Sequence, residues 1–586
     1  MQHNTYRPSS ARASDDAREE LCTAAQKVFG WDTLRPEQLD AMVPLLDGRD
    51  VLAVMATGSG KSAIYQVPSL LLPGVTVVVS PLIALQNDQI AGLDHSEAPE
   101  AVAINSRQRE SENEANWRAV LEHDADYVFL APEQLAKDEV LERLRSVEVS
   151  LLVVDEAHCV AMWGHDFRPE YLRLGDVAEA LGRPPVVALT ATASPPVRED
   201  IVEALRMRDP LVVAGGFDRP NLDIEVRRHT DDGEKRRAVV EAVASLPGPG
   251  ILYAATRKDT ERYADALRER GIDACPYHAG MRAAEREDVH LGFLDGRCDV
   301  VVATSAFGMG IDKPDVRFVV HASVPDSVDS YYQQIGRAGR DGEPATVLMF
   351  YRPEDLSLAT FFTTHNPDEE LIGRVFSAVR SASPMKLGRL RTELDVRGRR
   401  LSNAVNLLER CGALVSGRRG LSATDIPRRQ AIEQARETAA SGERLDRSRV
   451  EMMRGYAETR GCRRRFLLGY FGETSADPCG RCDTCRDGAS DEVATVSVLP
   501  GTGAAQPDCE TTEFIPNTRV VHTEWGPGVV MTCEHDLVTV LFDSEGYRTL
   551  SLAAVAESGV LTVDDDHLPD EASTAALPAH MEEPVA

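Results

Sequence analysis

Long apolar runs are missing from this sequence. None of its 586 residues belong to a stretch approaching the about 20 consecutive apolar residues that a membrane span requires. The first twenty residues are polar and of mixed charge, without the apolar centre of a secretory signal peptide. Cysteine is also sparse, with 11 residues, which favours thiols and a metal site over a disulfide framework. We therefore expect a cytoplasmic protein without membrane contact.

Positive charge is in deficit, with 64 Lys and Arg against 94 Asp and Glu and a net charge of −30. That balance would argue against a polyanionic partner if it were evenly spread. Residues 371–465, however, carry 22 Lys and Arg against 10 Asp and Glu, whereas residues 486–586 carry 3 against 19. A basic segment within an acidic chain can bind nucleic acid locally. The total charge therefore excludes no partner.

The chain is too long for a single hydrophobic core, so several domains are expected. Short apolar runs alternate with helical patterns, which predicts two α/β lobes with mostly parallel sheets and a cleft between the lobes. The expected strands are 50–55, 75–80, 127–130, 151–154 and 186–189 in the first lobe, and 251–253, 300–304 and 317–321 in the second.

A glycine-rich stretch, Ala-Thr-Gly-Ser-Gly-Lys-Ser at 56–62, follows the first expected strand. Backbone N–H groups of such a stretch can close around phosphates, Lys61 can neutralise the β and γ oxygens, and the Ser62 hydroxyl can bind Mg²⁺. The full P-loop pattern would place glycine where Met55 stands, so a plain glycine-rich turn is the competing interpretation. The flanking strand and helix favour a phosphate site made by Thr57, Gly58, Ser59, Gly60, Lys61 and Ser62.

The apolar run at 151–154 ends in two carboxylates, Asp155 and Glu156. Open α/β sheets bind ligands at the carboxyl ends of their strands, so this pair suits Mg²⁺ and the activation of a water molecule. The next residues include aromatic and basic side chains, which can stack on bases and grip phosphates. A nucleotide site and a nucleic-acid site are therefore neighbours along the chain. The loop residues assigned to nucleic acid are Trp163, His165, Phe167 and Arg168.

Two arginines of the second lobe, Arg337 and Arg340, are three residues apart and flanked by glycines. An arginine that reaches a transferring phosphate across a cleft can raise the rate by roughly 10³ to 10⁵. A solvated Arg-Gly turn or an RNA-binding patch would show the same pattern, but the P-loop lobe upstream favours arginine fingers. The expected catalytic residues are thus Lys61, Asp155, Glu156, His158, Gln333, Arg337 and Arg340.

Four cysteines, Cys462, Cys479, Cys482 and Cys485, have the spacing C-x16-C-x2-C-x2-C. Four thiolates suit tetrahedral Zn²⁺, and zinc is worth roughly 10–16 kcal/mol in small modules. A redox-active CxxC pair is the competing interpretation. Two overlapping CxxC pairs with a fourth cysteine favour structural zinc.

These motifs together resemble the RecQ family of superfamily 2 helicases, over about residues 29–342. The distinguishing pieces are Phe29-Gly30-Trp31 with Arg35-Pro36 and Gln38, Ser80-Pro81-Leu82-Ile83-Ala84-Leu85 with Asp88-Gln89, Asp155-Glu156-Ala157-His158-Cys159 with the loop at 163–171, and Tyr277-His278-Ala279-Gly280-Met281. The resemblance implies two RecA-like lobes and ATP-driven 3′-to-5′ movement on single-stranded DNA. It also implies that Trp31, Arg35 and Gln38 surround adenine, that Glu156 activates water, and that the loop reports DNA contact to the ATP site. Ala161-Met162 departs from the family pattern, and no stretch reads as an HRDC domain.

The region between the second lobe and the cysteines suggests a winged helix that precedes the zinc module, an order different from that of familiar RecQ proteins. Helical patterns at 371–379, 385–394 and 401–414 are followed by a basic hairpin tip at 416–421. A helical spacer with a solvated basic face is the alternative.

The C-terminal part, after an acidic linker, consists of short strands separated by turn residues, which suggests a small SH3-like barrel. It resembles the Tudor-type module of UvrD-type helicases, which docks on protein partners. Trp525 could anchor such an interface or could simply close the end of the barrel.

The expected organisation is α/β lobes followed by accessory modules. The boundaries are 1–20 disordered, 21–212 lobe 1, 213–365 lobe 2, 366–425 winged-helix-like, 426–488 zinc-binding module, 489–513 linker, 514–566 SH3/Tudor-like barrel and 567–586 disordered acidic tail.

The leading hypothesis is an ATP-dependent DNA helicase of repair or recombination that uses ATP, Mg²⁺ and Zn²⁺. It would be a monomer, associated with the nucleoid, and bind single-stranded DNA and duplex junctions. The alternatives are a DNA translocase that displaces proteins with weak strand separation, and a nucleic-acid scaffold with a vestigial ATPase. The intact Lys61, Asp155, Glu156, Arg337 and Arg340 argue against the scaffold.

Overall fold

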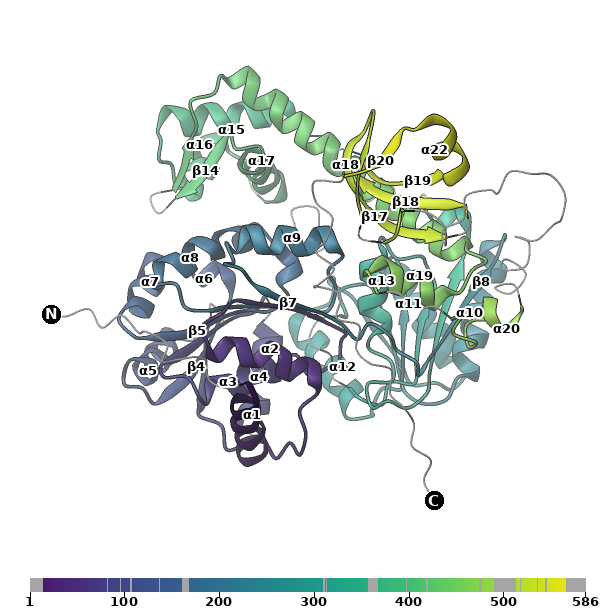
Figure 1. Cartoon of the computed structure of the whole chain (residues 1–586), viewed down its shortest axis with the longest axis horizontal. Coiled ribbons are helices and arrows are strands. Elements are labelled where there is room, and N and C mark those ends of the chain that lie inside the picture. Colours follow the sequence, from purple (N-terminus) through teal and green to yellow (C-terminus); the bar gives the residue numbers. More distant parts are fainter. Residues whose placement is uncertain are drawn as a thin grey trace. The chain divides into compact units, whose positions relative to one another are not determined.

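The computed structural model describes residues 14–564 (Figure 1), apart from 82, 95, 106–107, 136, 161–167, 309–310, 312, 357–366, 397, 418–419, 474–476, 489–512, 517, 535 and 543–544. The chain divides into two compact units, Met1–Val498 and Leu499–Ala586. Each unit is described by itself. Within the described ranges, no helix is both long and apolar enough to cross a membrane.

The first lobe is built on a parallel sheet in the order β3-β4-β2-β5-β6-β1-β7. Central strands such as β1 and β2 consist wholly of buried residues because helices cover both faces of the sheet. The strands are β1 Val51–Met55, β2 Val75–Val79, β3 Glu100–Ile104, β4 Ala125–Leu130, β5 Val149–Val154, β6 Val186–Thr190 and β7 Leu211–Gly215.

The helices of this lobe lie between its strands in the sequence. They are α1 Ser14–Phe29, α2 Pro36–Leu46, α3 Ala63–Ser69, α4 Ile83–Asp94, α5 Glu110–Leu121, α6 Pro132–Leu135, α7 Asp138–Arg145, η1 Ala157–Val160, η2 Pro169–Arg173, α8 Leu174–Ala180 and α9 Pro195–Ala204. Helix α1 begins at Ser14, so part of the segment expected to be disordered up to residue 20 is helical. Asp15 and Asp16 in its first turn favour that start.

The second lobe has its own parallel sheet, in the order β10-β11-β9-β12-β13-β8. Its strands are β8 Leu222–Arg228, β9 Gly250–Tyr253, β10 Ala274–Tyr277, β11 Val300–Ala303, β12 Phe318–His321 and β13 Ala345–Tyr351. Its helices are α10 Asp232–Ser245, α11 Arg257–Arg268, α12 Ala283–Leu294, α13 Val328–Ile335 and η3 Pro353–Asp355. The two parallel-sheet lobes expected from the sequence are therefore confirmed.

A helical segment with its own hydrophobic core follows the second lobe. It comprises α15 Glu369–Ser381, α16 Leu387–Leu394 and α17 Arg399–Arg410, and then an antiparallel hairpin of β14 Leu414–Gly417 and β15 Gly420–Ala423. The three helices and the hairpin lie in the order that the sequence indicates.

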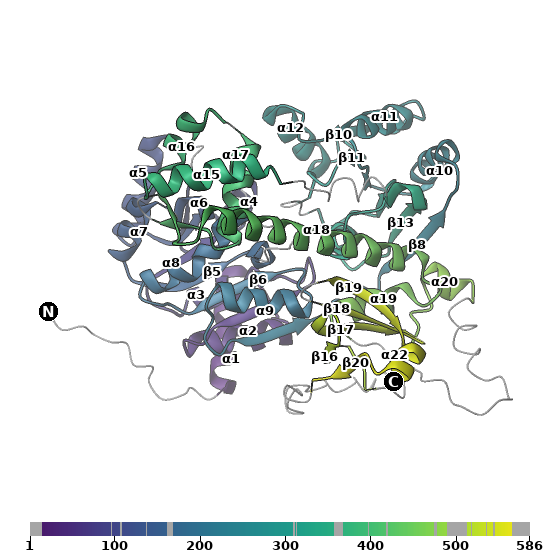
Figure 2. The same cartoon turned by 90° about the horizontal axis from the view of Figure 1, so that it is seen from above.

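The long helix α18, Arg428–Glu458, links this segment to the cysteine-rich region, and its course is clear in Figure 2. It contacts α15 and α17 as well as α13 of the second lobe. The cysteine-rich region adds two short helices, α19 Arg463–Tyr470 and α20 Asp483–Arg486.

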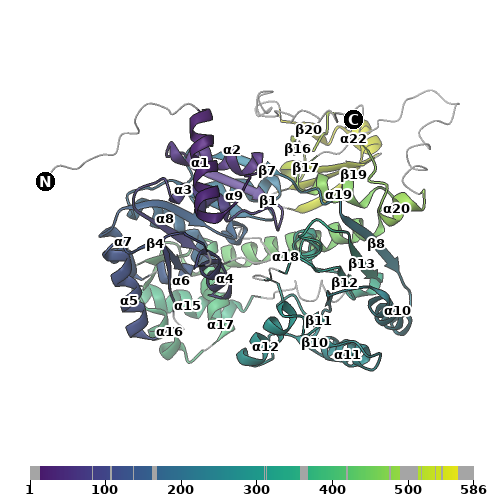
Figure 3. The same ribbon diagram turned by 90° about the horizontal axis from the view of Figure 1, so that it is seen from below.

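The second unit is an antiparallel sheet in the order β19-β18-β17-β16-β20, visible with α22 in Figure 3. The strands are β16 Arg519–His522, β17 Gly526–Glu534, β18 Leu537–Phe542, β19 Gly546–Ser551 and β20 Leu561–Val563, with α22 at Leu552–Ser558. Among the described residues β19 and β20 do not pair, so the expected strands are present but closure into a barrel is not found.

Two side chains of this unit differ from simple expectation. Trp525 is half-buried and stacks on His522, with ring centroids 4.0 Å apart, so it belongs partly to the core. Cys533 is disulfide-bonded, whereas the sequence alone favoured free thiols outside the zinc set.

Candidate functional site

The P-loop candidate lies directly after β1 and is shaped by two glycines in the left-handed region. Gly58 has φ +83°, and a Cβ there would lie 3.3 Å from Cγ of Arg340. Gly60 has φ +77°, and a Cβ there would come within 2.6 Å of Nε2 of Gln38. Gln38 itself is buried and donates hydrogen bonds to the carbonyls of Ser59 (3.1 Å) and Gly60 (3.0 Å). The close approach of neighbouring groups therefore explains why glycine stands at both positions.

Lys61 lies at the centre of the charges in this region. Its ammonium donates to the carbonyls of Met55 (3.0 Å) and Ala56 (3.2 Å). Burial lowers the pKa of Lys61, Glu156 and Asp155 raise it, and Arg340 lowers it again. These four charged groups from both lobes thus act on one another around the P-loop.

The carboxylate pair is held at the end of β5 by hydrogen bonds. Gln89 donates to Oδ2 of Asp155 (3.1 Å), and the Tyr171 hydroxyl donates to the Asp155 carbonyl (3.0 Å). Glu156 has φ +50°, an unusual value for a residue with a side chain. Burial and the neighbouring Glu156 raise the pKa of Asp155 to about 6. A buried carboxylate short of positive charge fits a divalent cation.

Ser62 is the second oxygen ligand that this cation would need. It stands at the N-terminus of α3, where its side chain makes no capping hydrogen bond. The donor set of a hydroxyl and a carboxylate consists of the oxygen ligands that Mg²⁺ prefers.

His158 connects the carboxylates to the end of β6. Its Nδ1 lies 2.9 Å from Oγ1 of Thr190 and 3.3 Å from Oε2 of Glu156. Thr190 also hydrogen-bonds the backbone of Thr192 in both directions. The turn after β6 is therefore coupled to the carboxylate pair.

The three residues expected near adenine have different environments. Gln38 contacts the P-loop, as described above. Trp31 is half-buried and stacks on Phe29, with centroids 4.5 Å apart. Arg35 is exposed at the start of α2, where its backbone N–H donates to Oε1 of Gln38 (2.9 Å).

The two candidate arginine fingers point to different places. The side chain of Arg340 lies against Gly58 of the P-loop. Arg337 is buried and hydrogen-bonds Tyr253 inside the second lobe, where its guanidinium also lies next to Gly308. Gln333 is half-buried on α13. The structure therefore brings Arg340, but not Arg337, to the P-loop.

Most of the loop assigned to nucleic acid, including Trp163, His165 and Phe167, lies outside the described residues. Arg168 is described: its NH1 donates to the Pro81 carbonyl (3.0 Å) and lies 3.9 Å from Oε1 of Glu133. Its guanidinium thus fastens the end of the loop to the segment after β2.

The four cysteines form a single cluster, with their sulfur atoms all within 4.8 Å of one another. Backbone N–H groups of Cys479 and Cys482 donate to the sulfurs of Cys462 (3.3 Å) and Cys479 (3.4 Å). Such hydrogen bonds are typical of thiolate ligands, and the donor set suits tetrahedral Zn²⁺.

Several contributors were not identified from the sequence. Gln89 and Tyr171 orient Asp155, and Thr190 orients His158. Arg219 contacts both lobes from the connector between them. The connector sequence Phe217-Asp218-Arg219-Pro220 offered a signal, since it places a lone arginine between two predicted lobes.

Two parallel-sheet lobes, a glycine-rich loop after β1 and paired carboxylates after β5 define the class of fold, a two-lobe helicase-type architecture. The model of the DEAD/DEAH box helicase family matches residues 35–201, that of the helicase conserved C-terminal domain matches 234–342, and that of the RecQ zinc-binding domain matches 423–486. The chain therefore combines two helicase domains with a RecQ zinc-binding domain, and it is similar to proteins named RecQ. The matched domains bear out ATP with Mg²⁺, and Zn²⁺, as its cofactors.

Two similar proteins illustrate the relationship. A probable ATP-dependent DNA helicase RecS of Bacillus subtilis is 39% identical over 56% of this chain and 66% of its own length. The ATP-dependent DNA helicase RecQ of Pasteurella multocida is 35% identical over 78% of this chain and 61% of its own length. The chain thus spans less than two thirds of these relatives. Among solved structures, the DUF1998 helicase MrfA bound to DNA has 18% identity and a TM-score of 0.49, over 70% of this chain and 60% of that one.

Proposed function

We propose that this protein is an ATP-dependent DNA helicase that moves 3′-to-5′ along single-stranded DNA and separates duplexes in repair or recombination. The observation that carries the proposal is the gathering of Lys61, Asp155 and Glu156 of the first lobe with Arg340 of the second around one P-loop. The relatives described above bear names of ATP-dependent DNA helicases, which supports DNA as the polymer.

The proposed nucleotide site uses groups of both lobes. Lys61 and the N–H groups of residues 57–62 hold the phosphates, and Trp31, Arg35 and Gln38 lie around adenine. Ser62 and Asp155 would hold Mg²⁺, which would neutralise negative charge on the phosphates. Glu156 accepts a proton from the attacking water, and His158 orients Glu156. The remaining members of the proposed catalytic set are Gln333, Arg337 and Arg340.

The proposed DNA contacts come from two regions. The loop from Trp163 to Arg168, which includes His165 and Phe167, reports DNA contact to the ATP site, whose carboxylate pair lies shortly before it in the sequence. The segment 366–425 is proposed to be a winged helix that contacts duplex DNA, with α17 as the groove-binding helix. Its basic surroundings support this role, because residues 371–465 carry 22 Lys and Arg against 10 Asp and Glu.

The second unit is proposed to be an SH3- or Tudor-like module that docks on a protein partner. Its strong negative charge would repel phosphates, which favours protein over DNA. The proposal includes a monomer that works in the cytoplasm on the nucleoid, with the domain boundaries set out in the sequence analysis.

Strand separation on matched DNA substrates tests the proposal. We expect the full-length protein to open a 3′-tailed duplex with ATP and to leave a 5′-tailed duplex closed. Lys61→Ala should abolish ATP hydrolysis and unwinding while DNA affinity stays within about threefold, because the change removes a phosphate contact and no DNA contact. Normal DNA-stimulated turnover by Lys61→Ala would contradict the P-loop assignment.

One observation favours a second candidate, an ATP-driven translocase that displaces bound proteins with little unwinding. The α15–β15 segment precedes the matched zinc-binding residues 423–486 instead of following them, so the accessory elements that split duplexes are rearranged. Displacement of a protein roadblock from single-stranded DNA, without opening of either tailed duplex, would support this candidate over the helicase.

A further inference from the structure

The connector between the lobes, residues 216–221, contains a half-buried arginine, Arg219, that contacts both lobes. NH1 of Arg219 donates to the carbonyls of Thr57 (3.4 Å) and Gly336 (3.3 Å). NH2 donates to the carbonyls of Ala338 (2.7 Å) and Gly339 (3.0 Å). Thr57 belongs to the P-loop, and residues 336–339 include Arg337 and directly precede Arg340, the two candidate arginine fingers. One guanidinium therefore joins these two loops.

The charge of Arg219 is balanced in an unusual way. Burial lowers its pKa, the nearby Tyr332 raises it, and Arg35 lowers it further. Among the described residues, no carboxylate forms an ion pair with it. Arg219 is half-buried, and its charge meets backbone carbonyl oxygens instead of a carboxylate, so its partners are the backbones of the two loops.

The two loops joined by Arg219 pack closely. A Cβ on Gly336 would lie 3.3 Å from Oγ1 of Thr57, and a Cβ on Gly58 would lie 3.3 Å from Cγ of Arg340. The position of Arg340 relative to the P-loop thus depends on the backbone of residues 336–339. That backbone is held by Arg219 through three carbonyls.

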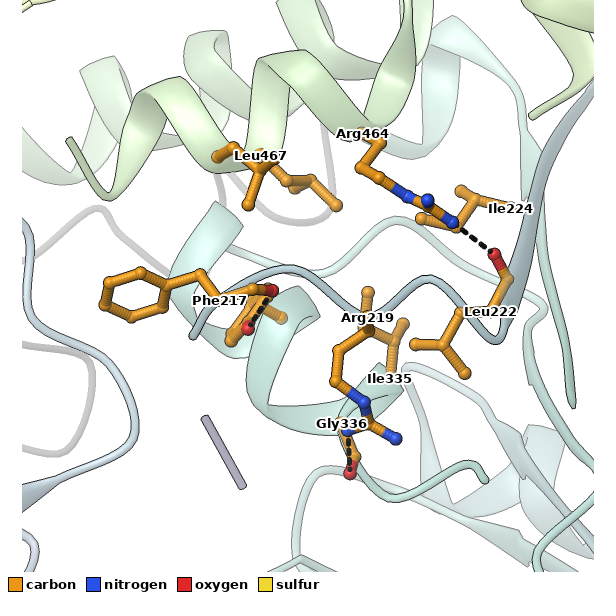
Figure 4. Close-up of a pocket in the computed structure, with 10 residues that line it drawn as sticks. Phe217, Arg219, Leu222, Ile224, Ile335, Gly336, Arg464 and Leu467 are labelled. Carbon is orange, nitrogen blue, oxygen red and sulfur yellow. Dashed lines mark hydrogen bonds between the residues drawn. The ribbon is translucent and has the colours of Figure 1, made fainter. Parts of the chain in front are cut away.

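The other side of the connector is fixed by the zinc-binding module. Phe217 stacks on Phe471 (centroids 5.0 Å apart), and its N–H donates to Oε2 of Glu473 (2.9 Å). Arg464 donates to the carbonyls of Leu222 (3.2 Å) and Pro220 (3.3 Å). Figure 4 shows Arg219 on this connector, with its bond to Gly336, and Arg464 of α19, with its bond to Leu222. The chain is therefore held in place on both sides of Arg219.

We propose that Arg219 is a positioning residue for ATP hydrolysis, which holds the arginine-finger loop against the P-loop. This inference rests on the proposed function. Arg219 acts through the backbone of its partners and makes no contact with the phosphates in this assignment. Its planar fork can serve carbonyls of two loops at once, which an ammonium cannot do in the same geometry.

Steady-state ATPase kinetics with single-stranded DNA test the proposal. For Arg219→Ala we expect kcat to fall about 10- to 100-fold, since small misplacement of a catalytic group costs rates of this order. The affinity for a fluorescent ATP analogue should change less than about threefold, because the P-loop amides and Lys61 remain. Arg219→Lys should restore only a minor part of kcat.

Arg486→Ala is the matched control. It removes an arginine of the zinc-binding module that pairs with Glu225 on β8 (3.0 Å) instead of the connector, so kcat should stay within about twofold of the parent. Equal melting temperatures and equal zinc content for the two variants exclude a folding defect. Should Arg219→Ala fail to fold, Arg219→Gln gives the same comparison with a polar side chain retained.

A double mutant separates positioning from a general structural role. If Arg219 acts through Arg340, then Arg219→Ala combined with Arg340→Ala should be no slower than Arg340→Ala alone. Additive losses, or a normal kcat for folded Arg219→Ala, would overturn the inference. Absence of ATP hydrolysis in the parent protein would instead overturn the proposed function, so the two failures are distinguishable.

Discussion

Arg337 and Arg340 share a loop but not an environment. Arg340 lies against the P-loop at Gly58, whereas Arg337 is buried next to Tyr253 and Gly308. Because a phosphate bound by the P-loop would lie near Arg340, this arginine can act from the position that the structure shows. Arg337 would have to leave the Tyr253 hydroxyl first. The difference makes single substitutions at the two positions informative about separate steps.

Arg168 is the described residue of the loop that we propose reports DNA contact to the ATP site. Replacing it with alanine removes the bond to the Pro81 carbonyl, worth about 1.5–3 kcal/mol for a charged donor. We expect the DNA-stimulated ATPase rate of Arg168→Ala to fall about tenfold or more and the DNA-free rate to fall less than about twofold. Rates with and without single-stranded DNA measure this.

Arg143→Ala is a suitable control for that experiment, since Arg143 forms ion pairs with Glu114 (2.7 Å) and Glu139 (3.0 Å) on the same lobe. A proportional loss of both rates in Arg168→Ala would show that the loop end is merely structural.

The burial of His321 predicts that the free energy of unfolding depends on pH. It is fully buried between Tyr253 and Tyr331, and burial lowers its pKa to about 4. The unfolded chain protonates near pH 6.5, so it binds more protons than the folded protein between pH 6.5 and 4. Stability therefore falls as the pH drops through this window, by about 2 kcal/mol at pH 5. His321→Phe should lose less melting temperature than the parent between pH 7 and pH 5, and parallel pH profiles would refute the assignment.

At the scale of elements, α20 and the residue Arg481 before it dock on β8 through charged side chains. Arg481 pairs with Asp223 (2.8 Å), Arg486 pairs with Glu225 (3.0 Å), and Asp483 accepts from the N–H of Val226 (3.1 Å). Partly exposed pairs contribute little each. We therefore expect the cysteine cluster, rather than these ion pairs, to hold the backbone of this region in place.

Cys482→Ser should remove zinc and destabilise this region, because structural zinc is worth roughly 10–16 kcal/mol in small modules. Elemental analysis should find less than one zinc per chain, with a lower melting temperature. Cys22→Ser, on helix α1, should keep both values. A stable Cys482→Ser protein with full zinc content would contradict the ligand assignment.

At the scale of the whole molecule, the division at Leu499 separates all nucleotide-site residues from the acidic sheet. Deleting residues 499–586 should therefore leave DNA-stimulated ATPase activity within about twofold of the parent. The isolated sheet should not bind DNA at physiological salt, because its charge repels phosphates. ATPase assays of the truncated protein and gel-shift assays of the isolated sheet check these outcomes, and DNA binding by the sheet would overturn the proposed docking role.

The sequence by itself determined the local parts of this protein. The P-loop, the carboxylate pair after β5 and the cysteine cluster are encoded by neighbouring residues, and the alternation of apolar runs was enough to predict two parallel-sheet lobes. The resemblance to the RecQ family was inferred from the same short motifs. In each case the chemistry depends on residues close in the chain, so spacing carries the information.

Only the tertiary structure showed which residues distant in the sequence lie together. It brought Arg340, and not Arg337, to Gly58, and it placed Arg219 between Thr57 and residues 336–339. It also left the expected barrel unclosed among the described residues. The physical reason is that these outcomes depend on packing between segments more than a hundred residues apart, or on the pairing of strand edges, and periodicity along the chain encodes neither.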